Sequence, residues 1–164
     1  MEDTWTECVV ALGTNLGDRD RIAFEAVADI QATEGFSVVA QSTLHETVAV
    51  GMSGPDDTKP SYLNQVILVR SAWSARKTLD HLHGIELDHG RNRDGVRYAD
   101  RTLDLDLITY ADAVVEQDGL VLPHPRAHER RFVLQPWLEV DPNAVLPGRG
   151  LVASILEGLP ADRP

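Results

Sequence analysis

Between Leu103 and Leu107, hydrophobic and polar positions alternate strictly, with leucines at alternate positions and an aspartate between each pair. Successive side chains of a strand point to opposite faces, so Asp104 and Asp106 share one face and the leucines share the other. A strand rises roughly 3.3 Å per residue, which separates the two aspartates by about 7 Å. Because aspartate is depleted in strands, the leading interpretation of this pair is a site for a divalent cation.

The same periodicities predict the other elements. Asp18 is a natural N-cap for a helix that stops before Gly35, and Ser74 opens a second helix. The order strand, helix, strand, strand, helix, strand is the split β-α-β arrangement, so we expect an α+β ferredoxin-like sandwich with a mainly antiparallel sheet covered by helices. The predicted elements are strands at 7–13, 37–46, 62–70 and 103–108, a hairpin of 114–116 with 120–122, and helices at 18–33, from 74, at 125–134 and at 151–159.

The composition is that of an ordinary globular protein. The chain has 164 residues, of which 43% are hydrophobic and 25% are charged. This length suits one sizeable core, so we expect residues 1–164 to form a single domain. No apolar run is long enough to cross a bilayer and the first residues are acidic, so we expect a cytoplasmic protein, and a monomer. The single cysteine, Cys8, lies in an apolar strand and is expected to be buried.

The distribution of charge narrows the choice of partner. A net charge of -11 argues against binding to nucleic acid or to a membrane surface. Seven of the fifteen Lys and Arg residues nevertheless fall between Arg91 and Arg131. An acidic protein that concentrates positive charge in one region suits a small, highly charged anion, such as a nucleoside triphosphate.

Paired aspartates and clustered arginines together suggest phosphoryl transfer. Mg²⁺ is normally held by one or two carboxylates, while waters and substrate phosphates complete its octahedron. Asp104 and Asp106 therefore fit a magnesium-nucleotide site with one ion or with two. Arginine suits bidentate contact with phosphate oxygens, and catalysis of phosphoryl transfer consists mostly of positioning and charge neutralisation.

Zinc binding and covalent catalysis have little support. His81 and His83 face different directions on the expected helix, and His124 and His128 lack a Glu-x-x-His context. The chain also contains no Gly-x-Ser-x-Gly elbow and no obvious Ser/His/Asp constellation.

Two features each allow two interpretations. Glu86 is a carboxylate on the apolar face of the second helix, and it either pairs with an arginine of the following loop or acts directly on a ligand. The turn at 13–17 resembles a phosphate loop only loosely, because it lacks the Walker lysine, so we prefer an ordinary strand-to-helix turn.

The run from Arg97 to Ile108, RYADRTLDLDLI, resembles the signature of the 6-hydroxymethyl-7,8-dihydropterin pyrophosphokinase family. Members of this family transfer a pyrophosphoryl group from ATP to a pterin in folate biosynthesis. Further segments resemble the family in order and spacing, so the resemblance covers nearly the whole chain; they are 11–19, 62–64, 85–93 and 122–132.

The resemblance implies a site for two substrates. Asp104 and Asp106 would bind two Mg²⁺ ions that bridge the phosphates of ATP, and Arg91 and Arg101 would join them in catalysis. The pterin hydroxymethyl oxygen would attack the β-phosphorus and AMP would leave, with Asp106 as a weakly supported general base. The nucleotide would be contacted by Glu86, Arg93, Arg97, Tyr98, His124 and Arg130. The pterin pocket would be lined by Thr47, Tyr62, Asn64 and Phe132.

The chain departs from the family pattern at several positions. Tyr98 replaces a frequent Trp, and Asp100 adds a third carboxylate next to the signature arginine. The prolines usual after Thr47 are missing, so the family pattern does not define the shape of the pterin loop in this chain. Two other functions stay open: a nucleotidyltransferase, or a ferredoxin-like module that binds pterin or nucleotide without turnover.

Overall fold

The computed structural model describes residues 4–15, 17–47, 50–51, 54–55, 61–89 and 103–160. At its centre an antiparallel sheet has the strand order β2-β6-β1-β7, and the short strand β3 also pairs with β6. Two strand-helix-strand units therefore interleave, which is the ferredoxin-like arrangement, and the predicted fold class is confirmed. The strands of this sheet are β1 (Thr6–Thr14), β2 (Phe36–Gln41), β3 (His45–Thr47), β6 (Tyr62–Ser71) and β7 (Asp104–Tyr110).

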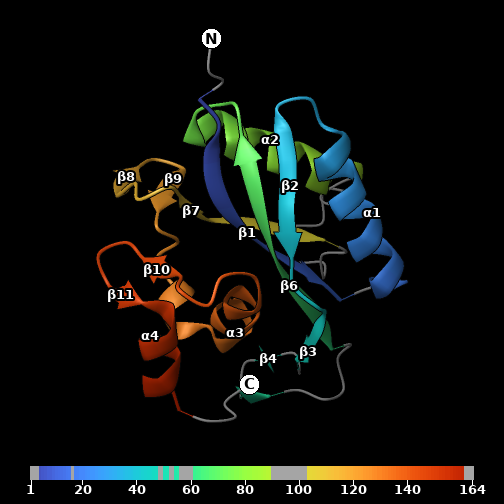
Figure 1. The fold of residues 1–164 in the computed structure, drawn as a ribbon. Helices are drawn as coiled ribbons and strands as arrows, with labels where there is room; N and C mark the ends of the chain where they lie inside the picture. Colours follow the sequence, from blue (N-terminus) through green and yellow to red (C-terminus); the bar gives the residue numbers. More distant parts are fainter. Residues whose placement is uncertain are drawn as a thin grey trace.

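Helices cover both faces of the sheet (Figure 1). Helices α1 and α2 pack on one face, where Val10 and Leu105 belong to their core. Helices α3 and α4 pack on the other face, where Val9 and Ile108 belong to a second core. Side chains along the central strands thus alternate between two hydrophobic cores. The helices are α1 (Arg19–Ala32), α2 (Ala75–Asp88), α3 (Arg131–Val140) and α4 (Val152–Gly158).

The predicted starts of α1 and α2 are confirmed by their N-caps. The side chain of Asp18 accepts a hydrogen bond from the backbone N–H of Arg21 (3.2 Å), and Ser74 does the same for Lys77 (3.2 Å). Each cap satisfies an N–H group that the first helical turn leaves without a partner. Gly35 follows α1 with φ of +100°, and a Cβ there would lie 2.4 Å from the ring of Trp73. Only glycine fits this turn.

Two predicted elements differ from the structure. The strand expected at 37–46 is divided into β2 and β3, because Ser42 leaves the regular ladder and its Oγ accepts the backbone N–H of Val66 (3.0 Å). The helix expected from Pro125 begins only at Arg131, after a 3₁₀ turn η1 (Ala127–Glu129). The N–H of His124 instead donates to the carbonyl of Ile108 (2.9 Å), which holds this segment along β7.

Small two-stranded pairs complete the described chain. The predicted hairpin is confirmed as β8 with β9, and it packs beside β7. The strand pairs are β4 (Val50–Gly51) with β5 (Gly54–Pro55), β8 (Val115–Gln117) with β9 (Leu120–Leu122), and β10 (Val145–Leu146) with β11 (Gly150–Leu151).

Within the described ranges, no helix combines the length and the apolar character that crossing a membrane requires.

Candidate functional site

A pocket of about 810 Å³ opens on the α3 face of the sheet. Strands β1, β3, β6 and β7 and the start of α3 all contribute to its wall. Residues expected for the phosphate half and for the pterin half therefore meet in one cavity. The expected site residues that line it are Thr47, Tyr62, Asn64, Asp104, Asp106, Arg130 and Phe132.

The two aspartates lie side by side on β7 and face the pocket. Leu105 between them is 1% exposed and belongs to the opposite core, so the predicted alternation of faces is confirmed. Across the ladder, Asp104 is the partner of Gly13 and Asp106 is the partner of Ala11. Because these two partners have little or no side chain, no large side chain of β1 lies between the carboxylates and the pocket.

Arg130 brings positive charge to this carboxylate edge. Its Nη1 lies 3.8 Å from Oδ2 of Asp106, and its guanidinium carbon lies 5.5 Å from the centre of the Phe132 ring. A separation of 3.8 Å is an ion pair without a hydrogen bond, and partly exposed pairs of this kind contribute little to stability. Arg130 can therefore exchange Asp106 for a phosphate oxygen at small cost.

His124 lies near the same carboxylate. Burial lowers its pKa below the usual value of 6.5, the positive charges of Arg130 and Arg126 lower it further, and the negative charge of Asp106 opposes them. Its Nδ1 accepts the backbone N–H of Arg126 (3.2 Å). The imidazole is therefore neutral at pH 7 and carries its proton on Nε2.

Glu86 is 1% exposed, and its Oε2 accepts the backbone N–H of Leu105 at 2.9 Å. This contact fixes β7 between its two aspartates. Neither interpretation proposed from the sequence included this contact. The loop whose arginines were candidate partners of Glu86 lies outside the described residues, so that choice stays open.

Asn64, which is 6% exposed, connects the residues that are expected to line the pterin half of the pocket. Its Nδ2 donates to Oγ1 of Thr47 at 2.7 Å and to the carbonyl of His45 at 3.4 Å. Thr47 is in turn the ladder partner of Tyr62. Phe132 faces this group from the start of α3 and is 37% exposed, so its ring is available to a flat ligand.

Several expected site residues lie outside the described part of the chain; they are Arg91, Arg93, Arg97, Tyr98, Asp100 and Arg101. The structure also adds residues that the sequence pattern did not suggest, because they are contributed by a helix start, a strand end and the carboxyl-terminal segment. These additional lining residues include His45, Glu46, Glu129, Gln135, Leu159 and Pro160.

The aspartate pair suits a cation that needs few protein ligands. Within the described ranges, no three His, Cys, Asp or Glu side chains come together in a way that could enclose a metal ion. Two carboxylates at the edge of an open cavity match Mg²⁺, which takes its remaining ligands from water and substrate phosphates. The donor set is therefore compatible with magnesium and unsuited to structural zinc.

Comparison with known sequences identifies similar proteins. A family model described as 7,8-dihydro-6-hydroxymethylpterin-pyrophosphokinase (HPPK) matches residues 9–142. The 2-amino-4-hydroxy-6-hydroxymethyldihydropteridine pyrophosphokinase of Bacillus subtilis is 34% identical over 131 residues, which are 80% of this chain and 75% of that protein. The Haemophilus influenzae protein of the same name is 31% identical over 148 residues, 90% of this chain and 89% of that one.

Longer relatives contain a similar region. The folate synthesis bifunctional protein of Arabidopsis thaliana is 36% identical over 137 residues, which are 84% of this chain and only 27% of that protein. The solved structure of Plasmodium falciparum HPPK-DHPS with pteroate superposes with a TM-score of 0.69 at 12% identity, over 96% of this chain and 43% of that one. This likeness supports the fold alone, and the chain spans less than half of that structure.

Proposed function

Since this chain belongs to the 7,8-dihydro-6-hydroxymethylpterin-pyrophosphokinase family, we propose that it transfers pyrophosphate from ATP to 6-hydroxymethyl-7,8-dihydropterin. The products would be AMP and the pterin diphosphate, an intermediate of folate biosynthesis. The observation that carries this proposal is the convergence of an aspartate pair and a pterin-compatible wall on one pocket. A module that bound only one of the two ligands would not need both halves.

In the phosphate half, Asp104 and Asp106 would hold Mg²⁺, with two ions as our proposal. The bound metal would neutralise the charge that develops on the transferred group. Arg130 would leave its ion pair with Asp106 to contact a phosphate oxygen, and the neutral His124 would donate a hydrogen bond from Nε2. Arg91, Arg93, Arg97, Tyr98 and Arg101 are proposed as further nucleotide contacts because segment 85–93 and the signature from Arg97 resemble the family.

In the acceptor half, Phe132 would stack on the flat pterin ring while Thr47, Tyr62 and Asn64 border its edge. The hydroxymethyl oxygen would form a bond to the β-phosphorus of ATP. The bond from that phosphorus to the oxygen bridging it to the α-phosphate would break, and AMP would leave with that oxygen. The hydroxyl proton would be released to solvent in this step, and no side chain is assigned as its acceptor.

The test is direct. Purified protein is incubated with ATP, Mg²⁺ and the reduced hydroxymethylpterin, and AMP is measured with and without the pterin. We expect AMP formation that depends on both the pterin and the metal. Folded protein that forms no pterin-dependent AMP would contradict the proposal, and retention of ligand binding in that case would favour a binding module.

The expectations of a single domain, of a monomer and of a cytoplasmic location stay predictions. Gel filtration with light scattering of the purified protein tests the oligomeric state, and a mass near that of the 18.0 kDa chain is the expected result.

A further inference from the structure

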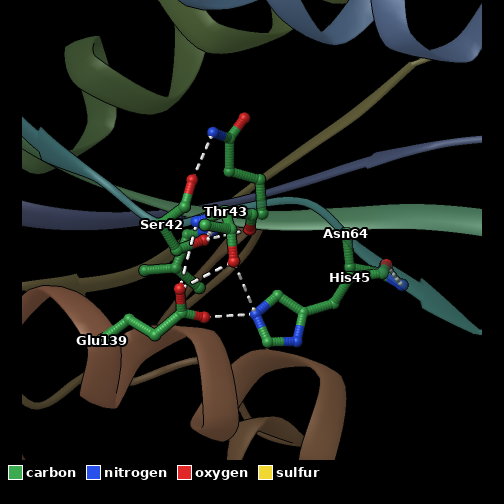
Figure 2. Close-up of polar contacts among 7 residues, drawn as sticks. Ser42, Thr43, His45, Asn64 and Glu139 are labelled. Atoms are coloured by element: carbon green, nitrogen blue, oxygen red, sulfur yellow. Dashed lines mark hydrogen bonds and ion pairs between the residues drawn. The ribbon is translucent and has the colours of Figure 1, made fainter.

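Glu139, near the end of α3, connects this helix to the segment that leads into β3 (Figure 2). Its Oε1 accepts hydrogen bonds from the backbone N–H of Thr43 at 3.2 Å and from the Thr43 hydroxyl at 2.8 Å. Its Oε2 is paired with Nε2 of His45. These contacts join residues separated by more than ninety positions in sequence.

The side chains of this group are only partly exposed. The exposed fraction is 35% for Glu139 and 26% for His45. Burial raises the pKa of Glu139, but the hydrogen bonds from Thr43 and His45 outweigh it and place the pKa below its usual value. Glu139 is therefore an ionised acceptor at pH 7, and charge-assisted hydrogen bonds of this kind are stronger than neutral ones.

Both segments that Glu139 joins contribute residues to the wall of the pocket. On one side, His45 lines the cavity and its carbonyl accepts the amide of Asn64, which also holds Thr47. On the other side, α3 begins next to Arg130 and carries Phe132 in its first turn. The distance between Phe132 and the Asn64–Thr47 pair therefore depends on how α3 is positioned relative to β3.

Few of the described side chains hold β3: Asn64 of β6 contacts His45 and Thr47, Arg19 pairs with Glu46 at 3.2 Å, and Glu139 links the strand to α3. The strand has only three residues, pairs only with β6 among the described strands, and follows residues 42–44, which lie outside the ladder. Figure 2 shows Glu139 reaching from the helix to the segment just before β3. A short edge strand of this kind is held in place by side-chain contacts more than by its ladder.

We propose that Glu139 is a positioning residue for the acceptor half of the site: by holding Thr43 and His45 it sets the spacing between Phe132 and the Asn64–Thr47 pair. This inference rests on the proposed function for the identity of the acceptor. It assigns to Glu139 an effect on pterin affinity through the position of β3. ATP affinity is expected to stay nearly unchanged, because the aspartate pair lies on β7 and the start of α3, next to Arg130, is held by the core residues Val133 and Leu134.

The experiment compares Glu139→Ala, which removes every contact, with Glu139→Gln, which keeps an acceptor oxygen for Thr43. Glu25→Gln is the matched control, because Glu25 is also a helix carboxylate in an ion pair, with Arg21, and lies outside the pocket lining. KM is measured for the pterin and for ATP, and the melting temperature is measured for each variant. Pterin binding is also measured by calorimetry with Mg²⁺ and a non-hydrolysable ATP analogue.

For Glu139→Ala we expect about a tenfold rise in the pterin KM and calorimetric Kd, with less than about a twofold change in the ATP KM. Glu139→Gln is expected to recover part of the loss, and Glu25→Gln to match the wild type. An equal rise in both KM values, or a lower melting temperature with unchanged pterin affinity, would overturn the proposal.

The calorimetric measurement separates this inference from the proposed function. If the wild type binds the pterin but forms no AMP, the proposed function fails while the comparison of Kd values still decides the role of Glu139. If the wild type does not bind the pterin at all, both are overturned.

Discussion

Asn64 and Asp104 lie on the two strands that flank β1, and the same residue, Gly13, is the ladder partner of both. Directly opposed residues of antiparallel strands point to the same face, and all three residues line the pocket. Because Gly13 has no side chain, a gap is left between the amide of Asn64 and the carboxylate of Asp104. Any substrate that spans the two halves must cross this gap.

Filling the gap should block the reaction without unfolding the protein. At Gly13 a Cβ would lie 3.6 Å from Oδ1 of Asn64, an ordinary contact, and φ is not in the left-handed region. We expect Gly13→Ala to fold and retain activity, whereas Gly13→Leu should lower kcat/KM about 100-fold or more by displacing substrate. Steady-state AMP formation with circular dichroism of both variants checks this, and full activity of the leucine variant would contradict it.

Removing either charge of the aspartate pair should affect catalysis more than stability. We expect Asp104→Asn and Asp106→Asn each to lower kcat about 100-fold or more and to raise the Mg²⁺ concentration needed for half-maximal rate. Asp112→Asn is the control, since Asp112 is an exposed carboxylate in the turn after β7. Magnesium titrations of AMP formation provide the measurement, and an unchanged magnesium requirement in both variants would count against the metal site.

The buried carboxylate of Glu86 should contribute to the stability of the fold. Glu86→Ala leaves the Leu105 N–H without its acceptor and opens a cavity in a fully buried position, at a cost of about 2–4 kcal/mol in the free energy of unfolding. Glu86→Gln retains an acceptor oxygen and should lose less. Urea denaturation compares the two. If they prove equally destabilised, the carboxylate charge matters more than the hydrogen bond to Leu105.

Glu139 should contribute an acid-dependent part of the stability. Its folded-state pKa lies below the usual 4.5, so the contribution is present above pH 4.5 and is lost as the pH falls through the folded-state value. We expect the wild type to be more stable than Glu139→Gln near pH 6, with the difference shrinking below about pH 4.5. Melting temperatures of both proteins across this range test it, and a difference that does not vary with pH would contradict it.

The thiol of Cys8 should be inert in the folded protein. It is 0% exposed, and burial together with the nearby Glu7 raises its pKa to about 12. Reaction with a disulfide reagent such as DTNB requires the thiolate, so at pH 8 we expect no release of the coloured product until denaturant is added. Rapid reaction of the native protein would show that β1 opens readily.

The features that could be predicted from sequence were those set by local pattern. Alternation along 103–107 identified both faces of β7, and the two N-caps fixed where α1 and α2 begin. The order of these elements predicted the fold class. The family was predicted from the Asp-x-Asp signature and the agreement of other segments, and the comparisons confirm it, together with the pyrophosphokinase activity of the family.

Contacts between distant residues could not be predicted in the same way. Glu86 meets Leu105 across 19 positions, and no spacing rule links a helix carboxylate to a strand amide. Glu139 and His45 are 94 positions apart, and each looks like an ordinary surface residue in its own segment. The predicted start of α3 at Pro125 was wrong. Proline suits a first helical turn, but a tertiary hydrogen bond from His124 to Ile108 holds that segment against β7 instead.

The position of Asn64, Gly13 and Asp104 on three adjacent strands also gives the site a fixed length. Neighbouring strands are spaced about 4.8 Å apart, so the backbones of Asn64 and Asp104 are held roughly 10 Å apart. This distance is set by backbone hydrogen bonds and backed by a filled core on the opposite face. Movements of the loops therefore leave this separation unchanged, and an acceptor whose hydroxyl lies at a different distance from its ring edge should react more slowly.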